Sequence, residues 1–190
     1  MRVLIVLLLL LCTPFAKARS PDDLVKAARA QIGVTTLYDP AYRKLTFPGG
    51  DVPPDRGVCT DVVIRAYRRL GIDLQELVNR DMRAAWSKYP KSWGLKSTDT
   101  NIDHRRVPNL DVFFRRHGTA LPLSDVAADY KPGDIVTWEI PPRLPHIGIV
   151  TNERSTAGIP LVIHNIGAGT QIDDVLFAFK MVGHYRYLPR

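Results

Sequence analysis

Cys59 and five histidines are the side chains of this 190-residue sequence best suited to nucleophilic chemistry. A thiolate attacks carbonyl carbon atoms, and a histidine held by a third polar group can take the thiol proton and pass it to the leaving group. Cys59 stands in the stretch GVCTDVVIRAYRRLGID, where a helix is expected to begin. Backbone N–H groups at a helix start favour the thiolate and can also hold an oxyanion. The stretch therefore indicates either a nucleophile or a small buried apolar side chain.

The first 18 residues decide how many thiols the mature chain keeps. A basic residue precedes an apolar run at residues 3–11, and a small-residue pattern ends at Ala18, which is typical of a secretory signal peptide. The run is too short to span a bilayer comfortably. We therefore expect cleavage after Ala18 and export to the periplasm or the extracellular space of a bacterium. Cleavage removes Cys12 and leaves Cys59 alone, which excludes an internal disulfide.

Length and charge narrow the class of protein. Residues 19–190 suit a single catalytic domain with a hydrophobic core of its own. They contain 24 basic and 19 acidic residues, a net charge of about +5, which favours anionic polymers. For an exported protein these are the cell wall or the membrane surface, not nucleic acid. There is no HExxH and no paired-cysteine pattern, so we expect no metal and no other cofactor. We also expect a monomer.

Helices are expected in the first half of the chain. Ser20 and Pro21 predict a helix start, and Gly33 predicts its stop. Helical spacing predicts a second helix from Cys59 to about Gly71, after an exposed loop. Two more helices are expected, one capped by Asp73 and one in the stretch PNLDVFFRRHG.

Strands are expected in the second half, and they complete the fold class. The stretch KPGDIVTWEI alternates apolar and polar residues like a half-buried strand. Further strands are expected in HIGIVTN, IPLVIHN and MVGHYRYLP. Helices followed by sequential strands indicate an α+β fold, in which N-terminal helices pack on an antiparallel β-sheet.

Two histidines are placed to serve as partners of Cys59. His146 opens a strand directly after the loop PPRLP, and His164 lies near the end of the next strand, so strand pairing would bring the two imidazoles together. His164 and Asn165 point to opposite faces of their strand, so only one of them can orient His146. Gly148 shares a face with His146 and is expected to leave room for the cysteine helix.

The order of these motifs resembles the NlpC/P60 branch of the papain-like cysteine peptidases. The shared pieces are the cysteine helix, the PGDIVTW strand, the HIGIV strand and the later VIH. GVCTDVVIRAYR, NIDHRRVPNL and HNIGAG resemble, more narrowly, the bacterial family DUF1287. The resemblance implies an exported hydrolase that cleaves an amide bond in peptidoglycan stem peptides. It assigns Cys59 as the nucleophile, His146 as the base and His164 as the residue that orients the base.

One departure from the wider family concerns substrate recognition. NlpC/P60 enzymes usually have an aspartate before the cysteine that helps to recognise a free amine, whereas Val58 stands there in this chain. The segment NIDHRRVPN offers other substrate contacts, because arginine pairs with carboxylates in a bidentate manner. The alternative is a solvated loop. The candidate substrate-binding residues are Asp61, Asp103, His104, Arg105, Arg106 and Asn165.

Two other functions fit the same sequence. An acyltransferase or transpeptidase would use the same thiol and pass the acyl group to an amine. A noncatalytic cell-wall-binding domain would keep only the fold. Filled polar positions at 59, 146 and 164 favour catalysis over binding, and the choice between hydrolysis and transfer stays open. In each case the expected partner is peptidoglycan or its peptide fragments.

Overall fold

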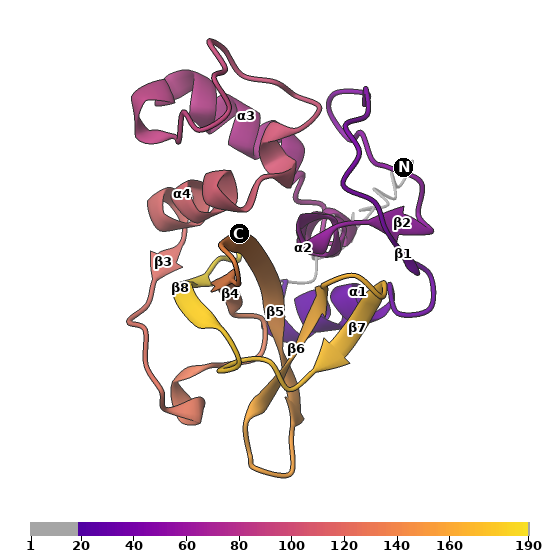
Figure 1. Ribbon diagram of the computed structural model, residues 1–190, viewed down its shortest axis with the longest axis vertical. Coiled ribbons are helices and arrows are strands. Elements are labelled where there is room, and N and C mark those ends of the chain that lie inside the picture. Colours follow the sequence, from indigo (N-terminus) through magenta and orange to yellow (C-terminus); the bar gives the residue numbers. More distant parts are fainter. Residues whose placement is uncertain (1–18, 190) are drawn as a thin grey trace, which may run out of the picture.

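The computed structural model describes residues 19–189, and a six-stranded antiparallel sheet forms its centre (Figure 1). The strand order is β3-β8-β4-β5-β6-β7. These strands are β3 (Thr119–Ala120), β4 (Ile135–Ile140), β5 (Leu144–Arg154), β6 (Pro160–Asn165), β7 (Thr170–Asp173) and β8 (Lys180–Arg186). A small parallel sheet pairs β1 (Leu37–Tyr38) with β2 (Arg56–Gly57). The expected signal peptide lies outside the described residues.

The α-helices of the described chain are α1 (Pro21–Arg29), α2 (Cys59–Arg69), α3 (Leu74–Ala84) and α4 (Val107–His117). Short 3₁₀ turns are η1 (Trp86–Lys88), η2 (Asp103–Arg105) and η3 (Ala127–Asp129). The caps follow the sequence, because Ser20 accepts the N–H of Asp23 and Asp73 accepts the N–H of Gln75. Helix α1 ends before the expected stop at Gly33. From Gln31 onward, the backbone N–H groups bond to the carbonyl oxygen three residues back, as in a 3₁₀ turn, in place of the α-helical bond to the fourth residue back.

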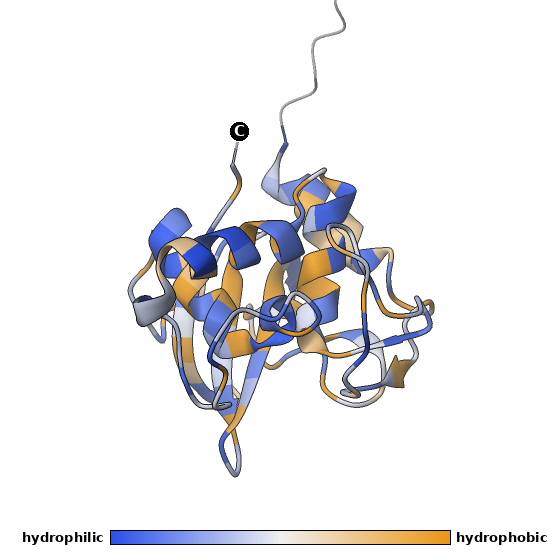
Figure 2. Ribbon diagram, turned by 90° about the horizontal axis from the view of Figure 1, so that it is seen from above, coloured by the Kyte–Doolittle hydropathy of each residue, from blue (hydrophilic) through white to orange (hydrophobic). Residues whose placement is uncertain are grey.

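The sheet is covered on both faces. The core on the helix side joins Leu24, Tyr67 and Leu110 to strand residues such as Ile147. On the other side, Tyr130, which follows η3, and Leu176, which lies in a turn, pack with their neighbours against Trp138. Figure 2 shows hydrophobic and hydrophilic residues alternating along the helices, as expected for helices that bury one face.

Strand β4 corrects one prediction. Its residues from Ile135 to Trp138 are all buried, so the expectation of a half-buried strand is wrong there. The physical reason is that both faces of the sheet are covered.

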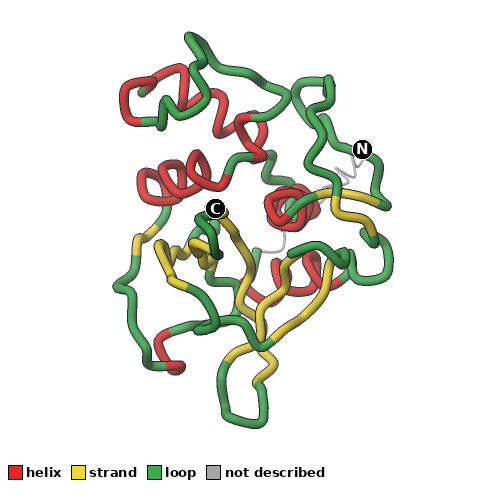
Figure 3. Tube along the Cα trace, viewed as in Figure 1, coloured by secondary structure: helices red, strands yellow, loops and turns green. Residues whose placement is uncertain are grey.

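The predicted α+β fold is confirmed, and the four expected helices and four expected strands are present. Strands β1, β2, β3 and β7 were not predicted, because segments of two to four residues are too short to show a period. The stretch between β1 and β2 runs as loops and turns (Figure 3), as expected. Within residues 19–189, no helix is both long enough and apolar enough to cross a bilayer.

Candidate active site

Cys59 is the first residue of α2 and is buried, with 5 % of its surface exposed. The backbone N–H groups of Thr60, of Cys59 itself and of Ile147 on β5 point to its sulfur. The ladder between β5 and β6 reaches the pair Ile149 and Ile163. The sulfur therefore meets β5 just beyond this paired stretch, one residue along the chain from His146.

The protonation state of Cys59 differs from the expectation for a helix start. Burial raises the pKa of the thiol to about 12, although the N–H groups of Ile147 and Thr60 oppose that rise. Loss of water around the sulfur thus outweighs the helix terminus, and the prediction of an easily ionised thiol is wrong for the free protein. Burial, together with the nearby His164, lowers the pKa of His146 to about 3. A neutral thiol and a neutral imidazole therefore form the resting state.

His146 on β5 and His164 on β6 are in direct contact. Nε2 of His146 lies 2.8 Å from Nδ1 of His164, and the two rings meet edge to face at 78°. Gly148 permits this contact, because a Cβ atom there would lie 2.5 Å from Cγ1 of Val162 and 3.3 Å from Cβ of His164. The free space at Gly148 therefore admits β6 and not the cysteine helix, which corrects the expectation for this residue.

Asp173 on β7 extends this contact into a chain. Its Oδ2 lies 2.8 Å from Nε2 of His164. An ionised carboxylate only accepts hydrogen bonds, so His164 carries its proton on Nε2 and presents a lone pair at Nδ1. That lone pair accepts the Nε2 proton of His146. Nδ1 of His146 is then unprotonated, which is the form that a general base requires.

Asp173 was not predicted from the sequence, because it belongs to the short strand β7. A weak signal exists, since Gln171 and Asp173 alternate with Thr170 and Ile172 after a glycine turn. The ladder places Asp173 opposite Val162, two residues from His164 on the same face of β6.

Asn165 faces away from His146, as the alternation along β6 predicts. Its Nδ2 donates to the carbonyl oxygen of Gly57 at 3.1 Å, and its Oδ1 accepts the N–H of Gly167 at 3.1 Å. The side chain is fully buried. Asn165 therefore holds the strand that leads into Cys59 and does not face a substrate.

Asp61 and Arg105 form a buried ion pair beside the start of α2. Nε and Nη2 of Arg105 each donate to one carboxylate oxygen of Asp61 at 2.9 Å, and the two side chains are 2 % and 3 % exposed. The carboxylate also accepts the N–H of Val58 at 2.7 Å. Asp61 thus caps α2 and neutralises Arg105, so its charge is not available to a substrate.

The segment NIDHRRVPN is largely buried, so the alternative of a solvated loop is wrong. Asp103 and His104 are 1 % and 3 % exposed, and burial lowers the pKa of His104 to about 3. Thr60 donates to the carbonyl oxygen of Arg105 at 3.1 Å, which ties the segment to α2. Asp103 and His104 therefore support the site from behind, whereas Arg105 and Arg106 reach the pocket beside Cys59.

That pocket has a volume of about 200 Å³. Tyr38, Trp93, Arg106 and Pro145 form much of its wall. Tyr38 lies there because the ladder of β1 and β2 sets it opposite Gly57, two residues before Cys59. Burial, followed by the charges of Cys59 and Asp61, raises the pKa of Tyr38. Neither Tyr38 nor Trp93 was predicted, because each stands in a segment without periodicity.

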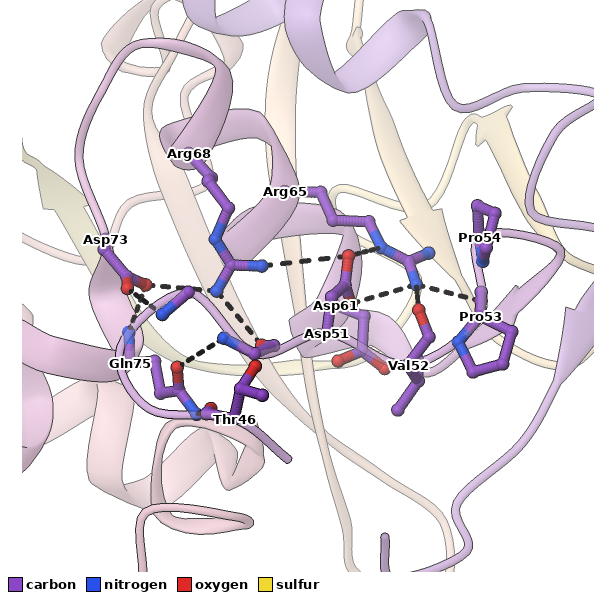
Figure 4. A network of polar contacts seen from close by, with 12 residues as sticks. Thr46, Asp51, Val52, Pro53, Pro54, Asp61, Arg65, Arg68, Asp73 and Gln75 are labelled. Carbon is purple, nitrogen blue, oxygen red and sulfur yellow. Dashed lines mark hydrogen bonds and ion pairs between the residues drawn. The ribbon is translucent and has the colours of Figure 1, made fainter. Parts of the chain in front are cut away.

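The loop before β2 is fastened to the helices by two arginines of α2 (Figure 4). Arg65 donates to both carboxylate oxygens of Asp51 at 2.8 and 3.1 Å and to the carbonyl oxygens of residues 52, 53 and 56 at 3.0–3.2 Å. Arg68 donates to the carbonyl oxygen of Gly50 at 3.2 Å and to Asp73 at 3.0 Å. These bonds hold the loop that enters the cysteine helix. Within residues 19–189, no group of three or more His, Cys, Asp or Glu side chains is arranged to hold a metal ion.

A cysteine helix packed on an antiparallel sheet, with paired histidines on adjacent strands, forms an α+β papain-like fold that is similar to a solved NlpC structure. More narrowly, the chain belongs to the family described as "Domain of unknown function (DUF1287)", whose profile matches residues 25–187. It is 57 % identical over 163 residues to "Uncharacterized protein YijF" of Escherichia coli (strain K12). That match covers 86 % of this chain and 80 % of the relative.

Two solved structures from Trichomonas vaginalis are also similar. NlpC2 matches with a TM-score of 0.50 and 18 % identity, over 92 % of this chain and 49 % of that chain. NlpC1 matches with a TM-score of 0.48 and 18 % identity, over 90 % and 46 %. This chain therefore spans about half the length of the solved structures it matches. The likeness to NlpC2 shows the fold.

Proposed function

We propose that this protein is an exported cysteine hydrolase that cleaves an amide bond in peptidoglycan stem peptides. The observation that carries the proposal is the hydrogen-bonded chain from Asp173 through His164 to His146. The last residue of this hydrogen-bonded chain, His146, directly precedes Ile147, whose N–H contacts the sulfur of Cys59. The net positive charge and the signal-peptide pattern of residues 1–18 support a protein that faces the cell wall.

The first chemical step forms one bond and moves one proton. Sγ of Cys59 attacks the carbonyl carbon of the amide while Nδ1 of His146 takes the thiol proton. Because both groups are neutral at rest, charge separates only as the tetrahedral intermediate forms. We assign the N–H of Cys59, at the start of α2, as a donor to the oxyanion, since the N–H of Val58 already binds Asp61.

The second half of the reaction returns the proton and releases the acid. The intermediate collapses, the C–N bond breaks, and the imidazolium gives its proton to the departing amine. A water molecule then attacks the thioester with His146 as base, and the C–S bond breaks to restore the thiol. His164 holds the ring throughout, and the negative charge of the Asp173 carboxylate at the end of the hydrogen-bonded chain favours the imidazolium.

Acyl transfer would share every step up to the thioester. The difference lies in whether water or an amine reaches that thioester, so the products decide between them. Hydrolysis releases a free carboxylic acid, whereas transfer joins the acyl group to the added amine.

The experiment that tests the proposal is digestion of purified peptidoglycan and of defined muropeptides, followed by mass spectrometry. Wild-type protein is expected to release peptides, and Cys59→Ala is expected to release none while its melting temperature stays close to that of the wild type. Full activity in Cys59→Ala would overturn the thiol mechanism. Binding of muropeptides without any product from the wild type would leave the noncatalytic wall-binding function.

A further inference from the structure

The pocket beside Cys59 has an unusual balance of charge. Its lining brings together two arginines with aromatic and apolar side chains, and no acidic side chain lines it among the described residues. Nearby carboxylates are occupied, because Asp61 pairs with Arg105 and Asp39 pairs with Arg43 at 2.7 Å. An ammonium group entering this pocket would lose water and meet cations, which is unfavourable.

Arg105 does not supply the free positive charge of the pocket. Its guanidinium is neutralised by Asp61, and its remaining hydrogen bonds reach the carbonyl oxygens of Asp39 and Ala41 at 3.3 Å. This arginine is therefore committed to the fold.

Arg106 is the cation with unused hydrogen-bonding capacity. Its guanidinium lies 4.1 Å from the ring centroid of Trp93. This cation–π contact holds the planar guanidinium against the pocket wall. Within the described chain its side chain makes one hydrogen bond, from Nη1 to Oδ1 of Asp103 at 3.3 Å. The other oxygen of Asp103 accepts the N–H of Asp99 at 2.6 Å, and burial raises the pKa of Asp103. Asp103 forms an ion pair with one nitrogen of the Arg106 guanidinium at 3.3 Å, and the remaining N–H groups of the guanidinium can donate to a carboxylate.

We infer that Arg106 and Trp93 form a carboxylate-binding subsite, and that the substrate carries a carboxylate close to the scissile amide and no free amine in this pocket. The inference rests on the proposed function for the scissile amide, and it adds which group of the peptide is recognised. Val58 agrees with it, because this apolar side chain lies in the pocket next to Cys59 and offers an amine no partner.

Binding to the Cys59→Ala variant tests the subsite without requiring turnover. The probes are three synthetic peptides: acetyl-L-alanyl-γ-D-glutamyl-L-lysine, the same peptide with the glutamate α-carboxylate converted to an amide, and the same peptide with a free N-terminal amine. Titration calorimetry is expected to show at least about tenfold tighter binding of the carboxylate than of the amide, because charge-assisted hydrogen bonds are lost in the amide. The free amine is expected to give no gain in affinity.

Arg106→Gln in the same background is expected to abolish the preference for the carboxylate, and Trp93→Leu is expected to weaken it. The matched control is Arg69→Gln, which removes one exposed positive charge at the far end of α2 and should keep the preference. Arg106→Lys keeps the positive charge but removes the bidentate guanidinium. Its melting temperature shows whether a lost preference comes from the missing guanidinium or from a loss of folding.

Equal affinity for the carboxylate and amide peptides, no measurable binding of the carboxylate peptide, or a preference that survives Arg106→Gln would each overturn the inference. Turnover by wild-type protein is measured separately on the same peptides. A carboxylate preference without hydrolysis would contradict the proposed function and leave the subsite standing.

Discussion

At the scale of single residues, the chemistry depends on which nitrogen of each histidine carries the proton. Asp173 determines this for His164, and His164 determines it for His146, through two contacts of 2.8 Å. Cys59 and His146 are both neutral at rest, because burial disfavours each charged form. In the proposed mechanism, proton transfer therefore accompanies substrate binding and does not start from a preformed ion pair.

Asp173→Asn is the residue-scale test of this chain. An asparagine can donate its amide N–H to Nε2 of His164, which would move the ring proton to Nδ1 and remove the acceptor for His146. We expect kcat to fall roughly 10²-fold or more with little change in KM, as for a base held in the wrong tautomer. Kinetics on muropeptides and ¹⁵N NMR of the imidazole tautomers provide the measurements.

The matched control for that variant is Asp174→Asn. It changes the neighbouring carboxylate, which is exposed and takes no part in the hydrogen bonds from Asp173 to His146. Asp173→Glu should recover part of the activity. Unchanged kcat and unchanged tautomers in Asp173→Asn would show that the carboxylate plays no part in setting the base.

At the scale of elements, the site forms where α2 approaches the end of the ladder between β5 and β6. Gly148 lets β6 approach β5, and Asn165 ties β6 to the carbonyl oxygen of Gly57. The same oxygen accepts the N–H of Asp39 at 3.1 Å, so one peptide group joins β6 to the end of β1, which carries Tyr38. Correct placement of the cysteine thus depends on how the loop between β1 and β2 is fastened.

Arg65→Gln tests the fastening of the loop. The Arg65 side chain is 11 % exposed and donates to one carboxylate and three carbonyl groups. Glutamine cannot replace these bonds, so we expect the free energy of unfolding to fall by about 2–4 kcal/mol, since hydrogen bonds to charged groups contribute about 1.5–3 kcal/mol each. Chemical denaturation measures the loss, and limited proteolysis within residues 46–56 should become faster.

Arg69→Gln again serves as the comparison, because Arg69 is exposed on the same helix. It should change stability by less than about 0.5 kcal/mol, as is usual for surface substitutions. Equal stability of the Arg65 and Arg69 variants would contradict the role assigned to this arginine.

At the scale of the whole molecule, burying neutral histidines makes stability depend on pH. Burial lowers the pKa of His104 and of His146 to about 3 from the usual histidine value of about 6.5, and it also lowers the pKa of His164. The unfolded chain therefore binds protons that the folded chain refuses, and the stability present above about pH 6.5 falls as the pH falls toward the folded pKa values. At pH 5 the loss is about 2 kcal/mol for each of His104 and His146.

Urea unfolding at pH 8, 6.5 and 5 measures this loss, in a range above the titration of most carboxylates. His104→Gln should reduce the slope between pH 6.5 and 5 while leaving His146 and His164 in place. A free energy of unfolding that stays constant from pH 8 to pH 5 would rule out the assignment of neutral buried histidines.

The sequence alone determined the helices, four strands of the sheet, and the order of cysteine and histidine motifs, because these depend on local periodicity and on caps such as Ser20 and Asp73. It also limited the orienting residue to His164 or Asn165, since alternation along a strand is a local property. Only the tertiary structure decided that His164 meets His146 and that Asp173 lies behind it, because those contacts join three strands.

Burial likewise belongs to the tertiary structure. The segment NIDHRRVPN reads as polar, yet Asp103, His104 and Arg105 are enclosed, and an ion pair with Asp61 compensates the charge of Arg105. The sequence indicated that Cys59 starts a helix, but packing against β5 removed the water around its sulfur and raised its pKa. Desolvation depends on residues that are distant in the chain, and for that reason only the folded structure could show that the resting thiol is neutral.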